Sequence, residues 1–459
     1  MSALAPLPFV RALQQHKARV YTVGGTVRDE LLGKPSKDVD LLVAGLPQQV
    51  LIRLLRQYGR VQLTGRAFGV IKFLPRQWNG PPIDIALPRT EVSTGVGHRD
   101  FDVVFDHTLP IETDLGRRDF TINALAIDLA TGRLIDPFGG RQDLEQRRLR
   151  QVSDRAFPED PLRMLRGIQL AARFDLRVEA ATRHAMQTHA AAITTVAPER
   201  VAEELRKLFQ ATSPASGFIL MHEVGLLLYV LPEVAALVGA GESTPDAFVR
   251  TMRRLDAVQQ REELAYRGHL DLLLAALLQD TSLAEATLVA SQPEQRAQVA
   301  AYKARQRLEA LKMTMIGARL DLVETLIQQS SFVTATLAAD ARRRHFVSRV
   351  GVEATLMLFE LRLAERLANA PEQPADDILS LRQRLRDDID RRVPLSIKEL
   401  AINGHDLQRL GIPPGPRLGQ LLQHLLQQVL DDPTRNTRAY LLGLVQQEIA
   451  TQEEGERLS

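Results

Sequence analysis

The chain has 459 residues, 45% of them apolar and 25% charged, which is the balance of a soluble globular protein. It contains no cysteine, which excludes disulfides, thiolate zinc sites and cysteine nucleophiles and predicts a cytoplasmic protein. The formal net charge of +2 is too small to indicate nucleic-acid binding, so any basic surface must come from local clustering.

The chain also lacks the signals of a membrane or secreted protein. No uncharged apolar run approaches the ~18–20 residues that a membrane helix needs. Residues 1–17 carry Pro6 and Pro8 in their only apolar stretch and no small-residue cleavage site, so we expect no secretory signal and no membrane association. At about 150 residues per domain, the length predicts about three structural units.

The hydrophobic pattern changes near residue 140. Before it, β-rich runs at residues 19–23, 39–43, 69–74 and 83–87 alternate with glycine and proline. Between them, residues 48–58 have the apolar spacing of an amphipathic helix. After residue 140 the helix formers Leu, Ala, Gln and Arg dominate. We predict an α/β or α+β domain followed by a long all-helical region.

A glycine turn follows the first predicted strand. Gly24 and Gly25 allow a tight turn at which the backbone can approach a ligand closely. A short helix is predicted over residues 26–32, with Thr26 and Asp29 at the spacing of a capping box. Backbone N–H groups at such a helix start suit a phosphate, and Arg28 in the first turn could clamp phosphate oxygens.

Two aspartates open the next predicted strand. Asp38 and Asp40 are two residues apart, so their side chains project from the same face. Adjacent carboxylates repel each other unless they share a divalent cation, and Mg²⁺ prefers oxygen ligands together with a triphosphate. A bare D-x-D is more often a pair of surface aspartates. Here it follows G-G-T-V-R-D closely, which makes the pattern far more specific.

These motifs resemble those of the class II tRNA nucleotidyltransferases, the CCA-adding enzymes, and the related bacterial poly(A) polymerases, within the DNA polymerase β-like superfamily. The resemblance implies an α+β protein: a catalytic head with a small mixed sheet, then an all-helical neck, body and tail. It implies that Asp38 and Asp40 hold metal and that Asp84, in PPIDIAL, is a third active-site carboxylate. A hydrogen-bonded structural aspartate is the alternative for Asp84.

Two further segments extend the resemblance within the predicted head. Arg117, Arg118 and Asp119 match the family's R-R-D motif, in which the second arginine and the aspartate hold the phosphates and ribose of the nucleotide. Residues 89–106 match a flexible loop that reshapes the site between C and A addition. An ordinary surface loop remains the alternative for that segment.

A helix near residue 160 carries the residues expected to choose the base. Asp160, Arg163 and Arg166 recur at i, i+3 and i+6, and with Glu159 they match the family's E-D-x-x-R motif. A carboxylate can accept from the amino group of cytosine or adenine while a guanidinium donates to the ring nitrogen. Uracil and guanine reverse that pattern. The alternative is an exposed salt bridge on a helix.

One position departs from the family. Related enzymes often carry an arginine three residues after Arg166, where this chain has Gln169. Glutamine keeps hydrogen-bonding ability but loses the charge. The phosphate contact at this position, and the full C-to-A sequence of additions, are therefore left open.

Basic clusters occur at two places. Arg141, Arg147, Arg148 and Arg150 lie in the segment expected to connect head and neck, where Asp143 is expected to cap a helix. We favour contact of this cluster with the tRNA acceptor end over a solvated face. For residues 342–345, a solubilising helix face is favoured over an RNA-phosphate patch.

The resemblance divides the chain into a head (1–140), a neck with the base-recognition helix (141–215), a body (216–390) and a tRNA-binding tail (391–459). It implies template-independent addition of CCA to tRNA 3′ ends from CTP and ATP, by two-metal nucleotidyl transfer with Mg²⁺ and release of pyrophosphate. The rivals are an A-adding or CC-adding specialist, a poly(A) polymerase and an inactive RNA-binding relative. No stable protein partner is expected.

Overall fold

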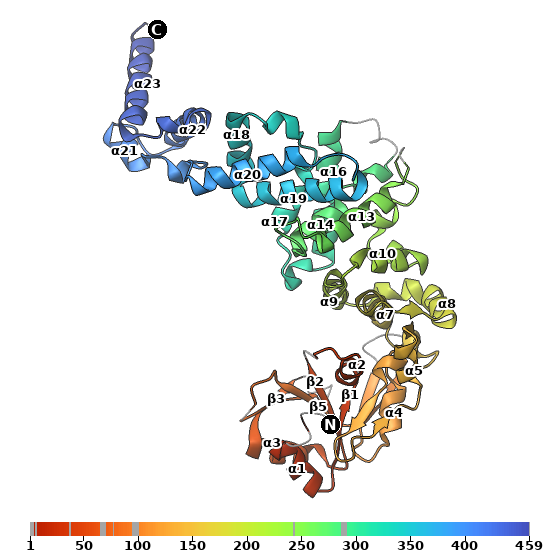
Figure 1. Cartoon of the computed structure of the whole chain (residues 1–459). Coiled ribbons are helices and arrows are strands. Elements are labelled where there is room, and N and C mark those ends of the chain that lie inside the picture. Colours follow the sequence, from red (N-terminus) through yellow and green to blue (C-terminus); the bar gives the residue numbers. More distant parts are fainter. Residues whose placement is uncertain are drawn as a thin grey trace. The chain divides into compact units, whose positions relative to one another are not determined.

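The computed structural model forms two compact units, residues 1–235 and 236–459. It describes residues 4, 7–35, 38–64, 70–76, 78–93, 101–241, 244–285 and 292–458. The first unit contains the sheet and the second is helical, which confirms the predicted α+β class (Figure 1). Among the described residues, no helix combines the length and apolarity that crossing a bilayer requires.

A seven-stranded mixed sheet is the centre of the first unit. Its strands run in the order β3-β4-β5-β2-β1-β8-β9, and only β2 and β5 pair in parallel. The strands are β1 (Arg19–Val23), β2 (Val39–Ala44), β3 (Gly59–Thr64), β4 (Val70–Pro75), β5 (Ile83–Ala86), β8 (Ala126–Asp128) and β9 (Leu134–Ile135). The predicted strands are confirmed to within one residue at each end.

Two helices cover one face of this sheet. Helix α1 (Pro8–Gln15) and α3 (Gln48–Tyr58) pack their apolar stripes on strand residues such as Leu41 and Ile85 (Figure 1). The predicted helix 48–58 is confirmed. It forms because Leu51, Leu54 and Leu55 recur at helical spacing and bury together, which stabilises it more than propensity does.

The opposite face of the sheet carries the acidic residues. Alternate residues of β2, including Leu42, pack against α4 (Ile111–Gly116) through Ile111 and Leu115. Asp40 belongs to this alternate set, because its neighbour Leu41 points into the other core. Parallel pairing sets Asp40 beside Asp84 on this same face.

A hairpin stands where a loop was expected. Strands β6 (Arg89–Ser93) and β7 (Phe101–Phe105) pair antiparallel as a separate two-stranded sheet. Most of the predicted loop 89–106 is therefore extended ladder, because alternating β-branched and aromatic residues favour pairing. Residues 94–100 lie outside the described part of the chain.

The rest of the first unit is mainly helical. Pro161 separates α6 (Ala156–Glu159) from α7 (Leu162–Phe174), and α7 packs on α9 (Pro198–Phe209) and α10 (Pro214–Glu223). The remaining elements are η1 (Thr121–Asn123), α5 (Gly140–Glu145), β10 (Arg148–Leu149), β11 (Arg177–Val178), α8 (Ala180–His189), η2 (Ala190–Thr195), α11 (Leu227–Val230) and α12 (Pro232–Ala235).

The predicted roles of the residues near α5 need correction. Asp136, not Asp143, caps this helix, by accepting from the backbone N–H groups of Gly140 and Arg141. Asp143 is instead buried, where it accepts from Thr121 and pairs with Arg148 and Arg150. The basic cluster is thus partly neutralised within the fold, because a buried carboxylate needs cationic partners.

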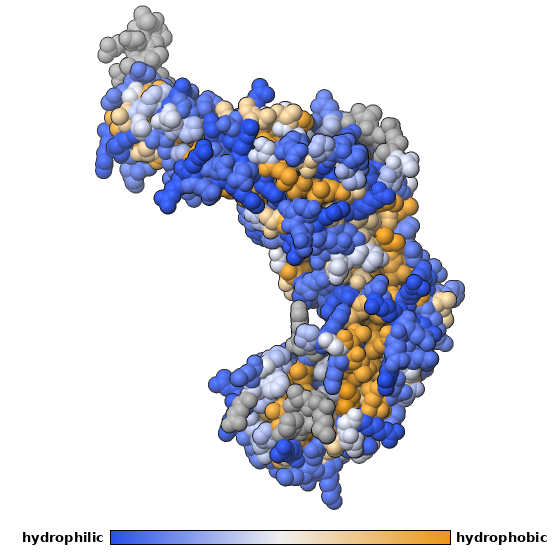
Figure 2. Space-filling view, viewed as in Figure 1, coloured by the Kyte–Doolittle hydropathy of each residue, from blue (hydrophilic) through white to orange (hydrophobic). Residues whose placement is uncertain are grey.

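The second unit is built from helices. Helices α13 (Ala247–Gln260), α14 (Leu270–Leu278), α16 (Pro293–Ala310), α17 (Leu320–Gln328) and α19 (Val352–Asn369) pack together. The others are η3 (Thr281–Ala284), η4 (Met313–Ile316), η5 (Thr334–Leu337), α18 (Asp340–Val350), α20 (Asp376–Asp390), η6 (Ile397–Glu399), α21 (Gly404–Arg409), α22 (Pro416–Asp431), η7 (Pro433–Arg435) and α23 (Arg438–Leu458). The visible face in Figure 2 is largely hydrophilic, with apolar areas between the hydrophilic ones.

The expected solubilising face at residues 342–345 is wrong for two of its arginines. Arg343 is 1% exposed and pairs with Asp340 and Asp388. Arg344 is buried and donates to the backbone carbonyls of Leu430 and Asp431. Both guanidiniums join segments of the helical unit, which the local pattern of basic residues does not reveal.

Candidate active site

The predicted glycine turn brings the backbone against an arginine. Gly24 has φ +68° and precedes α2 (Gly25–Leu31). This left-handed φ favours glycine, and a Cβ at Gly24 would lie 2.5 Å from Nη1 of Arg118, so a substitution would strain the backbone and displace that guanidinium. The turn therefore positions the second arginine of the R-R-D motif directly over the start of α2.

Thr26 does not form the predicted capping box. No side chain caps α2; instead, the Thr26 hydroxyl donates to the backbone carbonyl of Asp38, at 3.2 Å. Its Oγ1 also accepts from the backbone N–H of Asp40, at 3.0 Å. Thr26 thus joins the glycine turn to Asp40 of β2 and to Asp38, which directly precedes that strand, because the turn packs against β2 rather than standing free.

The surroundings of Asp40 and Asp84 raise the pKa values of both carboxyl groups. Burial raises the pKa of Asp40 to about 6; Asp84 and Asp38 contribute to this rise, while Arg118 and Arg28 oppose it. Burial also raises the pKa of Asp84, although Lys72, paired with it on β4, lowers it. A cation placed among these carboxylates would relieve their repulsion.

The donor set fits a divalent cation that is shared with a polyphosphate. Asp38 and Asp40 offer hard oxygen ligands, as Mg²⁺ requires. In the described residues, no group of three Asp, Glu, His or Cys side chains is arranged to hold an ion alone. Mg²⁺ commonly takes one or two carboxylates and completes its shell with phosphate oxygens and water, which this geometry allows.

Asp114, which the sequence does not single out, holds both arginines of the R-R-D motif. Asp114 is fully buried and pairs with Arg117 at 2.6 Å and with Arg118 at 3.3 Å. The Nε of Arg118 is itself buried and has no hydrogen-bond partner in the described part of the chain. Buried donors are rarely left unpaired, so this N–H suits an incoming acceptor such as a phosphate oxygen.

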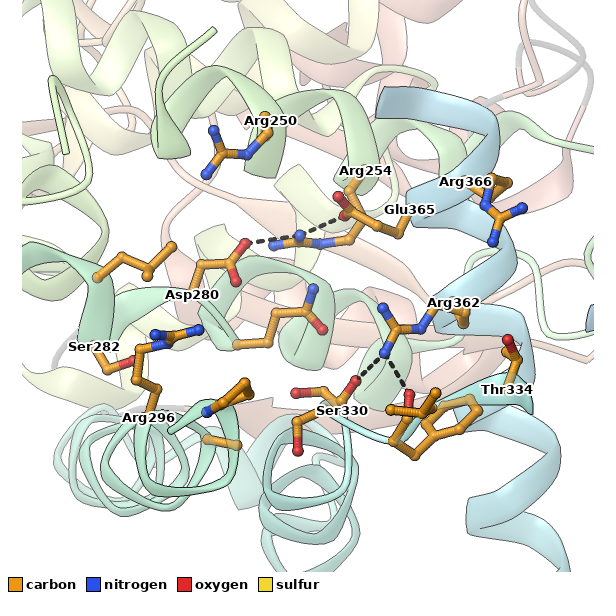
Figure 3. Close-up of a pocket in the computed structure, with 17 residues that line it drawn as sticks. Arg250, Arg254, Asp280, Ser282, Arg296, Ser330, Thr334, Arg362, Glu365 and Arg366 are labelled. Carbon is orange, nitrogen blue, oxygen red and sulfur yellow. Dashed lines mark hydrogen bonds and ion pairs between the residues drawn. The ribbon is translucent and has the colours of Figure 1, made fainter. Parts of the chain in front are cut away.

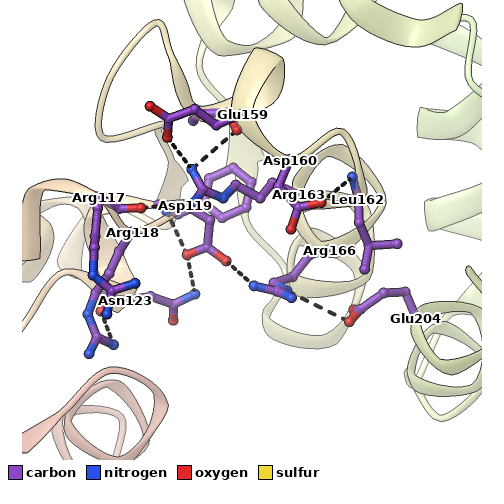
Figure 4. A network of polar contacts seen from close by, with 12 residues as sticks. Arg117, Arg118, Asp119, Asn123, Glu159, Asp160, Leu162, Arg163, Arg166 and Glu204 are labelled. Carbon is purple, nitrogen blue, oxygen red and sulfur yellow. Dashed lines mark hydrogen bonds and ion pairs between the residues drawn. The ribbon is translucent and has the colours of Figure 1, made fainter. Parts of the chain in front are cut away.

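A continuous polar network starts at Arg28. Its guanidinium donates to Asp29 at 2.7 Å and to the side-chain oxygen of Asn123 at 2.7 Å. Asn123 in turn donates to Asp119 at 3.0 Å, and Arg166 of α7 donates to the other oxygen of Asp119 at 3.2 Å. Figure 4 shows the part of this network that runs from Asn123 through Asp119 to Arg166 of α7.

The charge of Asp119 is stabilised within this network. Its burial alone would raise its pKa. The positive charge of Arg166, together with hydrogen bonds from Asn123 and the backbone N–H of Phe120, more than offsets burial and holds the pKa of Asp119 below its ordinary value. Asp119 is therefore an ionised anchor between the head and α7.

Arg163 and Asp160 do not pair with each other. Arg163 is buried and donates to the carbonyl oxygens of Arg117, at 2.9 Å, and Ala156, and it pairs with Glu159 at 3.4 Å (Figure 4). Asp160 accepts from the backbone N–H of Leu162. Its other carboxylate oxygen pairs with a partner on α9, Arg200, at 2.9 Å. The i,i+3 salt bridge considered above is thus not formed.

Arg173 lies one helical turn after Gln169, the position at which this chain departs from related enzymes. Arg173 donates to Gln169 at 3.2 Å, and its guanidinium lies 5.3 Å from the ring centroid of Phe174. Arg28 and Lys34 contact the same ring, at 4.4 and 4.9 Å. Burial lowers the pKa of Arg173, and the nearby charge of Arg28 lowers it further.

Several residues of this site were missed by the sequence reading. They are polar residues that act through others: Lys72, Asp114, Asn123, Arg173 and Glu204. Asn123 could have been found, because it lies only four residues after Asp119 of the R-R-D motif. Asp114 and Arg173 could also have been found, because their partners lie three or four residues away at helical spacing. Lys72 and Glu204 meet Asp84 and Arg166 only in the folded chain.

The mixed sheet, the glycine turn and the paired aspartates all lie within the first 140 residues of the chain. The family model described as "Poly A polymerase head domain" matches residues 20–150. Two further models match an RNA-binding region of polymerase A (175–237) and a second domain of tRNA nucleotidyltransferases (332–445). Three separate regions of the chain are therefore similar to tRNA nucleotidyltransferases and bacterial poly(A) polymerases.

Relatives and solved structures agree with this placement. A "Multifunctional CCA protein" of Xanthomonas campestris is 39% identical over 226 residues, covering 48% of this chain and 52% of that protein. One from Halorhodospira halophila is 39% identical over 274 residues, covering 58% and 62%. The matched region thus spans about half the length of these relatives. The Bacillus stearothermophilus CCA-adding enzyme, solved with CTP, has the same fold, with a TM-score of 0.67 at 22% identity and 97% of both chains covered.

Proposed function

We propose that this protein adds CCA to tRNA 3′ ends from CTP and ATP without a nucleic-acid template, acting in the cytoplasm. The observation that carries the proposal is the meeting of Asp40 and Asp84 on one sheet face with the turn that seats Arg118. The curated relatives named for CCA support the choice of substrate. In the reaction, the tRNA 3′-oxygen bonds to the nucleotide α-phosphorus and the bond to pyrophosphate breaks.

Asp38 and Asp40 would hold Mg²⁺, with Asp84 beside them. Mg²⁺ would supply activation of the attacking hydroxyl and neutralisation of the leaving pyrophosphate. Arg118 binds the triphosphate through its unpartnered Nε, and the backbone of Gly24 and Gly25 lets the phosphates approach closely. Lys72 balances the charge of Asp84 from the neighbouring strand.

Arg28 and Asp119 form the other wall of the nucleotide site. Three nitrogens of Arg28 already donate to Asp29 and Asn123, so its guanidinium is fixed before a nucleotide arrives. Asp119 fixes Asn123 and keeps one carboxylate oxygen on Arg166. We assign Asp119 to the ribose hydroxyls and Arg166 to holding that carboxylate in place. Such preorganisation limits the entropy lost when the nucleotide binds.

Base choice falls to Asp160 and Arg163, with Glu159 holding Arg163. To meet a base, Asp160 exchanges Arg200 for the amino group of C or A. Arg163 likewise exchanges a backbone carbonyl for the ring nitrogen. Asp160 and Arg163 therefore have hydrogen-bond partners both without a base and with C or A, so neither buried charge is left unsatisfied. U or G would leave both charges without a partner, which disfavours these two bases.

Arg173 supplies the charge that Gln169 lacks. Its hydrogen bond to Gln169 and its position near Arg28 set a guanidinium beside the proposed triphosphate site. The substitution at 169 therefore moves a cation along α7 by one turn rather than removing it. This favours the complete CCA programme over the A-adding specialist.

The roles of the segments follow from the same proposal. The head (1–140) performs the transfer, the neck (141–215) selects the base, and the body (216–390) and tail (391–459) bind tRNA. The family model for the second domain of tRNA nucleotidyltransferases, over residues 332–445, supports a place for tRNA there.

The test uses three tRNAs that end at the discriminator base, at C and at CC, incubated with Mg²⁺ and with CTP and ATP singly and together. We expect full CCA on all three by 3′-end sequencing. Addition of A to the CC-ending tRNA alone would indicate an A-adding specialist, and CC without A a CC-adding one. Long A tails would indicate a poly(A) polymerase, and no extension with retained tRNA binding an inactive relative.

A further inference from the structure

Phe174 is the last residue of α7, and its half-buried ring lies against three cations. The guanidinium carbon of Arg28 lies 4.4 Å from the ring centroid and that of Arg173 lies 5.3 Å from it. The ammonium nitrogen of Lys34 lies 4.9 Å from the same centroid. The face of an aromatic ring attracts cations at such distances, because its quadrupole is negative there. The ring therefore connects the end of α7 to α2 and to the residues that follow α2.

The guanidinium of Arg28 is buried and has both local and distant partners. Its Nε and Nη2 donate to Asp29, and its Nη1 donates to the side-chain oxygen of Asn123. An arginine has five N–H groups, so in the described part of the chain these bonds leave two of them for an incoming acceptor. Asp29 lies next to Arg28 on the same helix and moves with it. The position of Arg28 relative to the rest of the site thus depends on Asn123 and Phe174.

The contacts of Phe174 complete a closed loop of interactions. Arg28 donates to Asn123 at 2.7 Å, and Asn123 donates to Asp119 at 3.0 Å. Arg166 of α7 donates to the other oxygen of Asp119 at 3.2 Å. The same helix then returns to Arg28 through the ring of Phe174. Such a loop holds each member more firmly than an open series of contacts, because moving one member strains two contacts.

The ring also separates two like charges. Burial lowers the pKa of Arg173, and the charge of Arg28 lowers it further, while Asp29 and Glu204 raise it. Because both guanidiniums contact the Phe174 ring, its negative faces offset part of their repulsion. An aliphatic side chain at this position would fill similar space but would not attract a cation. The aromatic character of residue 174, and not only its volume, therefore matters.

We propose that Phe174 is a positioning residue for nucleotide binding, whose ring holds the Arg28 guanidinium in the orientation that receives the triphosphate. Phe174 acts through Arg28 and does not itself touch the nucleotide. The inference rests on the proposed role of Arg28 at the triphosphate. It adds a residue that lies outside the G-G, R-R-D and E-D-x-x-R motifs, at the opposite end of α7 from the base-selecting residues.

The test is a double-mutant cycle measured by equilibrium dialysis of the full chain with labelled CTP and Mg²⁺, without tRNA so that no transfer occurs. Phe174→Leu removes the aromatic faces and Arg28→Gln removes the cation. We expect Phe174→Leu to raise the Kd for CTP about fivefold in the wild-type background and to have no further effect in Arg28→Gln. Equal losses in both backgrounds would overturn the proposal, because the ring would then act independently of Arg28.

A second series keeps the shape of the ring, in case Phe174→Leu impairs folding, which melting by circular dichroism would reveal. Phe174→Tyr retains an aromatic face and should bind CTP as the wild type does. Mono-, di- and trifluorinated phenylalanine incorporated at residue 174 make the ring face progressively less negative at nearly constant size, so the Kd should rise with each added fluorine. A Kd that does not change along this series would contradict the proposal whatever the leucine variant does.

Phe332→Leu is the matched control. This half-buried phenylalanine and Arg362 line a cavity of the second unit, where the guanidinium carbon lies 5.2 Å from the ring centroid. Figure 3 shows Arg362 at this cavity, donating to the backbone carbonyl of Ser330. The control variant also loses a cation–π contact, but not at the proposed active site, so we expect CTP binding to stay unchanged.

CCA addition by the wild type is assayed in parallel, which separates this inference from the proposed function. Saturable CTP binding without CCA addition would contradict the proposed function, and the dialysis series would still decide the role of Phe174. CCA addition together with equal losses in both backgrounds would contradict the role of Phe174 alone. No saturable CTP binding by the wild type would overturn both.

Discussion

Arg118 of the first unit and Arg254 of the second differ in how far their donors are satisfied. Arg118 lies beside Asp40, and its buried Nε has no hydrogen-bond partner in the described part of the chain. Arg254 is 1% exposed, and Asp280 and Glu365 both pair with its Nη1. The first arrangement suits a metal–polyphosphate pair, whereas the second is a closed structural unit. The same residue type thus serves two purposes, depending on where the carboxylates lie.

Removing one carboxylate should break this contrast most strongly. Asp40→Asn makes the active site more cationic, so we expect CCA addition to fall about a thousandfold while tRNA binding is retained. Single-turnover incorporation of labelled CMP and a filter-binding assay measure the two. Glu145→Gln, an exposed carboxamide swap, is the control. Turnover close to wild type in Asp40→Asn would remove Asp40 from the metal site.

Replacing Asp160, the carboxylate proposed to select the base, tests whether its negative charge also determines which nucleotide is chosen. Asp160→Asn keeps the shape but can donate as well as accept, so we expect the preference for CTP over UTP to fall about tenfold to a hundredfold. The ratio of kcat/KM values for the two nucleotides measures this. Arg200→Gln removes the partner of Asp160 and should leave the preference intact. A loss of preference in Arg200→Gln alone would indicate that the arginine reads the base.

The hydroxyl of Thr26 tests whether the position of the carboxylates, and not only their charge, matters. Thr26→Val leaves the backbone N–H of Asp40 without an acceptor, so we expect kcat to fall about tenfold at little change in KM. Thr26→Ser should restore most of the rate. If serine fails to rescue while valine folds normally, the hydrogen bond is not what positions Asp40.

The smallest effect is expected at Arg173, the cation one turn after Gln169. Arg173→Gln should raise KM for CTP and ATP about fivefold with little change in kcat, because it removes a distant charge–phosphate attraction. Gln169→Arg in the same background should recover part of the affinity. Steady-state kinetics with a CC-ending tRNA and ATP check both variants. An unchanged KM in Arg173→Gln would mean that this arginine only packs on Phe174.

Much of the structure of residues 1–140 could be predicted from local sequence patterns. Alternation along β2 places Asp40 on the face opposite Leu41, and the glycine at 24 signals a left-handed turn. The stripe of Leu51, Leu54 and Leu55 identifies α3. These inferences hold because each rests on neighbours within one or two turns of the chain.

The errors share a cause. Thr26 fits a capping box by spacing, yet it bonds to β2 because the strand packs against the turn. Asp143 fits a helix cap, yet it is buried among Arg148 and Arg150. Ser, Thr and Asp side chains have several possible partners, and the nearest in space need not be the nearest in sequence.

The sequence by itself determined the α+β class, strand β2 with Asp40 and helix α7, because strand and helix periodicity are local. Only the tertiary structure decided which charges meet. Arg28 reaches Asn123 across 95 residues, and Arg254 reaches Glu365 across 111. The burial that makes such pairs matter depends on packing between distant segments, and no local pattern of charged residues encodes it.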